Sequence, residues 1–418
     1  MHRRRFLAAT AAVAPLFARG TEPPLSLASF DREMEAFMAA RKIPGGALAV
    51  VKDGRLVHAR GYGWADRERQ QRVEPTSLFR IASISKPITA VAVLKLVEQG
   101  KLKLADRVFD FLSLKPLIPA GKQADPRLCT VTILQCLQHT GGWDRDQSFD
   151  PMFRPRLIAT AVGEAAPASA PAVIRYMMGQ PLDFDPGTRY AYSNFGYCLL
   201  GRVIEKVTGK AYADFVQEVV LAPSGIKSMR LGRSLETGRA PNEVRYAMPG
   251  AETTESVFPG ASSKVAPPYG GFNLEAMDAH GGWLASAVDL ARFAAALHDA
   301  ETGPLLKAVT YRELHAAPPA PVSRNEDGSL KEVFYACGWQ SRPIVGRPGK
   351  ANHWHSGSLP GTRTLLVRRW DGLAWAALFN QRQDLANLPD TAIDPAMHRA
   401  ADAVQEWPKE DLFHQFPT

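Results

Sequence analysis

Apolar and polar positions predict strands near both ends of the chain and helices between them. The segment Leu27–Lys42 repeats apolar residues at helical spacing, and Ala47–Val51 and Leu56–Gly61 are short apolar runs joined through Asp53-Gly54. Asp-Gly between two such runs is the strongest short signal for a β-hairpin. We therefore expect a helix followed by an antiparallel pair of strands.

The middle of the chain, from about residue 95 to 230, has mainly helical periodicity. Between about residues 235 and 275 the sequence is rich in proline, glycine, serine, threonine and glutamate without a clear period, which predicts a long irregular connection. Such connections are uncommon unless they line a site or wrap a domain. Helices are expected at Val131–His139, Ala172–Met178, Tyr197–Lys206 and Ala211–Val220.

Strand patterns return in the last third of the chain. Ser286 and Asp289 have the spacing of a capping box, which predicts a helix that runs to Leu297. Asp371-Gly372 predicts a hairpin turn between the last two strands. The expected strands are Phe334–Gln340, Asn352–Gly357, Thr362–Arg368 and Leu373–Phe379, and a final helix follows at about residues 392–407.

The early hairpin has to pair with the late strands to complete one antiparallel sheet. The pattern therefore predicts an α/β (α+β) fold. One composite domain with the antiparallel sheet is expected from residues 21–95 and 275–418, and an inserted, mainly helical domain from residues 96–274. We expect a catalytic cleft between these two parts.

Composition and charge narrow the range of partners. The formal net charge is +8, and four of the arginines lie in residues 1–20, so the remaining charge is too modest and too evenly spread to predict nucleic-acid binding. No apolar run approaches the roughly 20 residues that a transmembrane helix requires. The four cysteines contain no C-x-x-C pair, and we expect buried free thiols, with a Cys129–Cys136 disulfide as the alternative.

Residues 1–20 have the pattern of an export signal. Arg3, Arg4 and Arg5 precede a short apolar region with small residues near its end. The order Arg-Arg-x-Phe-Leu resembles a twin-arginine signal, and a general secretory signal is the alternative. Both predict a periplasmic or secreted protein.

Phe79–Gly100 predicts a helix that is apolar over most of its circumference and is therefore buried. Ser83 stands where this helix begins and Lys86 one turn further on, so both side chains lie on one side. A hydroxyl is a weak nucleophile that gains from an amine able to take its proton and from N–H groups at a helix N-terminus. A second S-x-x-K, Ser224–Lys227, follows a proline and opens no apolar helix, so we interpret it as a turn.

Two further motifs carry polar side chains. Tyr192 and Asn194 precede an expected helix and can both face a cleft, although a core tyrosine and a helix N-cap are the alternative. His353 and His355 face one side of an expected strand, but no third ligand stands at metal-binding spacing, and we expect no metal or cofactor. Instead, His355-Ser356-Gly357 is interpreted as an edge strand where Gly357 lets a substrate approach the backbone.

In this order, Ser83-x-x-Lys86, Tyr192-x-Asn194 and His355-Ser356-Gly357 resemble the three motifs of the serine β-lactamase and penicillin-binding-protein superfamily. The resemblance is to its class C-like branch, which includes family VIII esterases and D-aminopeptidases, and it spans about residues 28–380. It implies a β-lactamase/transpeptidase-like fold.

The resemblance also implies roles for the residues of the motifs. Ser83 is the acylated nucleophile, Lys86 its base or electrostatic partner, and Tyr192 a general base, as a phenolate favoured by a nearby ammonium or through a shared proton. The substrate-binding residues are Asn194, His355, Ser356, Gly357 and Ser358, with the backbone N–H groups of Ser83 and Ser358 as the oxyanion hole.

The third motif departs from the Lys-Thr-Gly of β-lactamases, whose cation helps to bind the substrate carboxylate. His355 replaces that lysine and is mostly neutral at pH 7. The sequence therefore predicts a hydrolase for a small ester, amide or short D-peptide, with weak or absent β-lactamase activity. The alternatives are a penicillin-recognising or cell-wall-binding protein with little turnover, and a true β-lactamase.

Overall fold

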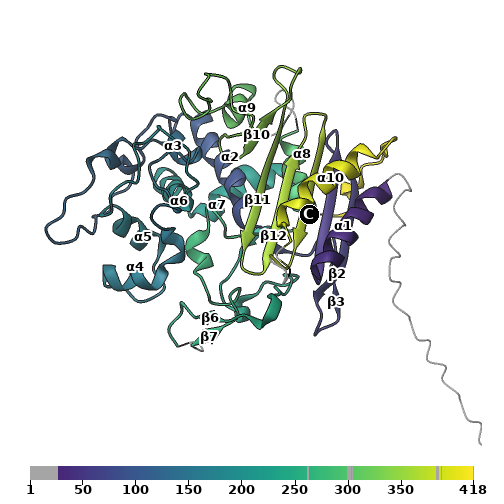
Figure 1. Cartoon of the computed structure of the whole chain (residues 1–418), viewed down its shortest axis with the longest axis horizontal. Helices are drawn as coiled ribbons and strands as arrows, with labels where there is room; N and C mark the ends of the chain where they lie inside the picture. The colour runs from purple at the N-terminus through teal and green to yellow at the C-terminus, as the bar shows by residue number, and fades with distance from the viewer. Residues whose placement is uncertain are drawn as a thin grey trace, which may run out of the picture.

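One antiparallel sheet joins the two ends of the chain (Figure 1). The structure is a computed structural model that describes residues 27–417 except 261–262, 299–302, 304, 383–385 and 387, so the expected export signal lies outside the described residues. Within them, the sheet has the order β3-β2-β1-β13-β12-β11-β10-β9. The strands are β1 Gly45–Lys52, β2 Arg55–Asp66, β3 Gln71–Arg72, β9 Phe334–Tyr335, β10 Gln340–Pro343, β11 Ala351–Leu359, β12 Thr362–Arg368 and β13 Leu373–Phe379.

The expected pairing of the early hairpin with the late strands is confirmed. β1 runs antiparallel to β13, with Gly46 opposite Phe379 and Lys52 opposite Leu373. The bounds of β12 and β13 coincide with the predicted strands. One predicted strand, Phe334–Gln340, is wrong: it is broken into β9 and β10, because a turn places Gly338 at a φ of +79°. Only glycine adopts such a φ readily.

Helices cover both faces of the sheet. Alternate residues of β1 face opposite sides, so Leu48 and Val50 pack with α1 Ala28–Arg41 and α10 Ile393–Asp402, while Ala47 and Ala49 pack with α2 Ser85–Glu98 and α8 Ala287–Ala296. The predicted first helix and the Ser286–Asp289 capping box are confirmed. The last helix ends at Asp402, earlier than expected.

The helical segments lie on the far side of α2 from the sheet (Figure 1). One continuous hydrophobic core runs from β1 through α2 into α6, so the predicted domain boundaries stay predictions. The helices here are α3 Ile133–Leu137, α4 Pro155–Val162, α5 Ala170–Met177, α6 Asn194–Thr208 and α7 Tyr212–Val216, and α9 Ala308–His315 follows later in the chain.

The predicted turn at Ser224–Lys227 is confirmed by Gly225 at a φ of +67°. The four cysteines are free, and three of them are buried. The expectation that the free thiols are buried is wrong for Cys129, which is exposed in the short 3₁₀-helix Pro126–Thr130. None of the described helices is both long and apolar enough to cross a membrane.

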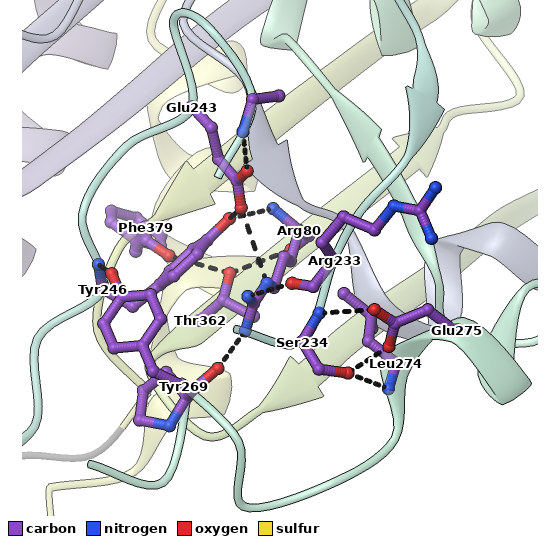
Figure 2. A network of polar contacts seen from close by, with 12 residues as sticks. Arg80, Arg233, Ser234, Glu243, Tyr246, Tyr269, Leu274, Glu275, Thr362 and Phe379 are labelled. Carbon is purple, nitrogen blue, oxygen red and sulfur yellow. Dashed lines mark hydrogen bonds and ion pairs between the residues drawn. The ribbon is translucent and has the colours of Figure 1, made fainter. Parts of the chain in front are cut away.

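The irregular connection at residues 235–275 is tied to Arg80, at the end of β4 Phe79–Arg80 (Figure 2). The buried Arg80 guanidinium lies 3.5 Å from the Glu243 carboxylate, and it donates to the carbonyl oxygens of Arg233 at 2.7 Å and Pro268 at 2.5 Å. The Arg80 backbone N–H donates to the Tyr246 hydroxyl, which donates to Glu243. The connection therefore wraps the segment that leads to Ser83.

Arg80→Met is expected to destabilise the protein by about 3–5 kcal/mol, because it leaves the Glu243 carboxylate buried without its cation. Urea unfolding of the variant and the wild type measures this difference. The double variant R80M/E243M removes both charges and should lose less stability than R80M alone. Equal or greater loss in the double variant would contradict a dominant role for the unpaired charge.

Candidate active site

Ser83 lies in a one-turn 3₁₀-helix, Ala82–Ile84, directly before α2. The preceding Ala82 has a φ of +49°, a left-handed conformation that costs a residue with a Cβ about 1–2 kcal/mol. The flanking backbone fixes this conformation: the Ile81 N–H donates to the Trp283 carbonyl at 3.0 Å, and Thr364 Oγ1 donates to the Ile81 carbonyl at 2.9 Å. The surrounding structure thus holds a strained residue beside the serine.

β11 passes very close to this segment at Gly357. A Cβ on Gly357 would lie 2.1 Å from the Ile81 carbonyl oxygen and 2.2 Å from Thr364 Oγ1. The predicted need for glycine is therefore explained by contact with the protein's own backbone. β10 pairs only with residues Ala351–Trp354 of β11, which leaves His355–Leu359 with β12 as its single strand partner among the described residues.

The Lys86 amine is fully buried beside the serine. Its Nζ lies 3.1 Å from Ser83 Oγ, 2.8 Å from Asn194 Oδ1 and 3.0 Å from the carbonyl oxygen of His280. Burial lowers the pKa of Lys86 well below its usual value, with nearby Asp150 acting in the opposite direction and Arg145 adding to the decrease. A neutral amine has two N–H donors, which match the two carbonyl oxygens, and one lone pair, which can face the serine.

Tyr192 is placed by the start of α6. Ser193 is the N-cap of this helix, with its hydroxyl accepting from the Gly196 N–H, so Asn194 is the first helical residue rather than the N-cap. Burial raises the pKa of Tyr192, and a hydrogen bond with Ser83 lowers it by less. Lys86 Nζ lies 4.7 Å from the centre of the Tyr192 ring. Burial is therefore the largest effect on Tyr192, and it favours the neutral phenol over a phenolate.

His355 is also neutral. Its Nδ1 lies 2.7 Å from the Ser356 carbonyl oxygen, which can only accept, so Nδ1 carries the hydrogen and Nε2 accepts from the Tyr335 hydroxyl at 2.9 Å. Burial and the proximity of Lys86 lower the pKa of His355 to about 3. His353, the other candidate of the pair, contacts Ser341 instead. The described residues contain no cluster of three or more potential metal ligands.

Sequence reasoning missed several polar groups of the site. Asp150 accepts from Asn194 Nδ2 at 2.6 Å, and His139 accepts from the Ser193 N–H at 3.2 Å while its ring lies 4.3 Å from that of Tyr192. The Arg145 guanidinium stands 4.9 Å over the Tyr192 ring. These residues lie in or beside loops without periodicity. The run from His139 to Trp143, which contains the first of them, was the one available signal.

A cleft of about 560 Å³ brings the predicted residues together. Its wall includes Ser83, Tyr192, Asn194, His355, Ser356 and Ser358, with Lys86 beneath it and Gly357 turned toward Ile81. Arg145, Arg363 and Arg382 also line it, and no aspartate or glutamate does so among the described residues. This charge favours neutral or negatively charged ligands over cations.

The fold and the cleft are of the β-lactamase and penicillin-binding-protein type. The Beta-lactamase family matches residues 30–396 of the chain. The chain therefore belongs to the beta-lactamase family, and the resemblance and fold class expected from the three motifs are confirmed.

Among curated relatives, the probable fimbrial assembly protein FimD, serogroup H1, of Dichelobacter nodosus is 32% identical over 201 residues, covering 48% of this chain and 45% of that protein. Protein flp of Staphylococcus aureus (strain N315) is 30% identical over 193 residues, covering 46% of this chain and 36% of that protein. The match spans less than half the length of each relative.

Solved structures share the fold over most of the chain. The octameric penicillin-binding protein homologue from Pyrococcus abyssi has a TM-score of 0.67 and 26% identity, covering 92% of this chain and 78% of that one. D-amino acid amidase from Ochrobactrum anthropi SV3 has a TM-score of 0.68 and 20% identity, covering 91% of this chain and 98% of that one. D-alanine carboxypeptidase AmpC from Burkholderia cenocepacia has a TM-score of 0.64 and 19% identity, covering 90% and 99%.

Gly357→Ala is expected to disturb the cleft, because the new Cβ would collide with the Ile81 carbonyl and displace the segment before Ser83. Ala82→Gly serves as the control variant, because it changes the same segment without adding a side chain. Glycine tolerates the φ of +49° without strain, so this variant should retain its stability. Thermal unfolding and the rate of Ser83 labelling by a fluorophosphonate probe measure both effects. Wild-type labelling of G357A would contradict the predicted contact.

Proposed function

We propose that the chain hydrolyses a small ester or amide through an acyl-Ser83 intermediate. The observation that carries this proposal is the buried Lys86 amine, 3.1 Å from Ser83 Oγ and held by two oxygen acceptors. A neutral amine in this position can take the serine proton, which is the activation that a hydroxyl nucleophile needs.

In the first step, Ser83 Oγ bonds to the substrate carbonyl carbon as its proton passes to Lys86. The backbone N–H groups of Ser83 and Ser358 stabilise the resulting oxyanion. When the tetrahedral intermediate collapses, the neutral Tyr192 phenol donates its proton to the leaving alcohol or amine, and the Lys86 ammonium returns a proton to Tyr192. Water then attacks the ester carbonyl, giving up one proton to Lys86, and Ser83 recovers a proton as the acid leaves.

The relatives guide the choice of substrate. The named activities of the structural neighbours are those of a D-amino acid amidase and a D-alanine carboxypeptidase, which supports amide or short D-peptide substrates besides esters. The neutral His355 supplies no cation at the third motif, which supports weak β-lactam hydrolysis. Residues 1–20 support export, so the proposed place of action is the periplasm or the exterior of the cell.

Ser83→Ala is expected to lower turnover of p-nitrophenyl butyrate on the order of 10³-fold or more, because no other group replaces the nucleophile. Ser224→Ala, in the second S-x-x-K sequence, is the matched control and should keep wild-type turnover. Esterase assays and mass spectrometry of the intact protein with esters, D-amino-acid amides and β-lactams measure both. Wild-type turnover in S83A would contradict the proposal. A stable penicillin adduct on the wild-type protein, without turnover of any substrate, would favour the alternative of a penicillin-binding protein.

Arg145→Gln is expected to move the acidic limb of the kcat/KM profile to higher pH. Lys86 has to be neutral to accept the serine proton. Burial is the largest influence and lowers the pKa of Lys86, the nearby Asp150 raises it, and the charge of Arg145 lowers it. Loss of that charge raises the pKa of Lys86, so a higher pH is needed to deprotonate the amine. Arg363→Gln, which removes another guanidinium of the cleft, is the control. An unchanged limb in R145Q, or an equal movement in R363Q, would contradict this account.

A further inference from the structure

A second cavity of about 770 Å³ is lined in part by residues of α9, and none of its lining residues belongs to the Ser83 cleft. Figure 1 shows α9 at one end of the sheet. It is formed by the ends of α8 and α9, the first residues of β11 and the hairpin between β12 and β13. Arginine, lysine and histidine side chains line it. No aspartate or glutamate among the described residues does.

Arg368 places a buried positive charge in this wall. The residue is 6% exposed, and its contacts are the Tyr311 hydroxyl at 2.8 Å, His315 Nε2 at 3.1 Å and the Leu297 carbonyl oxygen. Within the described part of the chain no carboxylate pairs with it. Leu297 is the C-cap of α8, so the helix dipole supplies about half of a negative charge. Among the described residues the remaining charge has no counter-ion, which is costly in a buried position.

Some hydrogen-bond donors in this wall also lack an acceptor. Arginine has five N–H donors, and the three contacts of Arg368 use three of them, which leaves two. Because His315 Nε2 accepts from Arg368, the hydrogen of the neutral imidazole is on Nδ1, and this buried atom has no hydrogen-bond partner. The neighbouring His353 ring stacks on His315 with 3.7 Å between ring centres. The stack supports the His315 ring from one side, and His315 itself lines the cavity.

We propose that this cavity binds a small organic anion, whose carboxylate or phosphate oxygens accept hydrogen bonds from Arg368 and from His315 Nδ1–H. The anion supplies the missing counter-charge and the missing acceptor together. Tyr311, Leu330 and Trp370, which also line the cavity, provide apolar surface for the organic part of the ligand. The volume of the cavity exceeds that of an inorganic ion and suits a ligand of metabolite size.

Isothermal titration calorimetry of the full chain tests this with benzoate, phenyl phosphate, inorganic phosphate and the neutral benzamide. Benzoate, phenyl phosphate or both should bind at one site, and benzamide should bind at least about tenfold more weakly, because it lacks the charge. The comparison of benzoate with phenyl phosphate shows which oxyanion the site prefers. Equal binding of benzamide, binding of inorganic phosphate alone, or no saturable heat with any anion would overturn the proposal.

Single-residue variants test whether the anion binds in this cavity. His315→Phe keeps an aromatic ring against His353 but removes the Nδ1 donor, and it should weaken anion binding at least about tenfold. Arg368→Gln should do the same, and H315F remains decisive if R368Q does not fold. Arg145→Gln removes one positive charge from the Ser83 cleft and should leave the affinity unchanged. Loss of binding in R145Q but not in H315F would place the anion in the cleft and refute the assignment. S83A should retain anion binding, so the proposed hydrolase function is tested separately.

Discussion

The position of Ser83 depends on how the backbone from Arg80 to Ala82 is held. Three parts of the chain hold it. Thr362 and Thr364 of β12 donate to the carbonyls of Arg80 and Ile81, and Trp283, the first residue of β8 Trp283–Ala285, accepts from the Ile81 N–H. The 235–275 connection contacts the Arg80 side chain through Glu243 and Pro268. These contacts offset the left-handed conformation of Ala82. A strained backbone conformation such as that of Ala82 persists only where many surrounding contacts hold it in place. The long connection, which has little regular structure of its own, provides some of these contacts.

Burial then shifts the pKa values of the titratable groups around Ser83. The same desolvation lowers the pKa of Lys86 and raises that of Tyr192, because in each case it disfavours the charged form. It also raises the pKa of Asp150, which contacts Asn194. Desolvation therefore shifts both the Lys86 amine and the Tyr192 phenol toward their neutral forms. The proton positions belong to the coupled set rather than to one residue.

The sequence predicted the strands and the three motifs of the site better than the groups that surround them. β12 and β13 were predicted with correct bounds because buried apolar runs flank an Asp-Gly turn. Ser83, Tyr192 and His355 were found because three short motifs in one order carry more information than each motif alone. The His280 carbonyl could not be found, because a backbone acceptor leaves no mark in side-chain chemistry. Asp150 and Arg145 lie in aperiodic segments, where contact depends on how the chain folds back.

The histidine of the third motif is consistent with this electrostatic arrangement. A lysine at position 355 would place a second cation near Lys86 in a water-poor site, and each charge would disfavour the other. The neutral imidazole avoids this repulsion, and its hydrogen bond with Tyr335 satisfies a buried nitrogen. Positive potential in the cleft comes instead from Arg145, whose side chain is 44% exposed, and from Arg363, which is paired with Asp390. A charge near solvent or beside a carboxylate costs less than an isolated buried one. The histidine therefore avoids a second cation beside Lys86, while Arg145 and Arg363 supply positive charge in the cleft wall that can attract an anionic ligand.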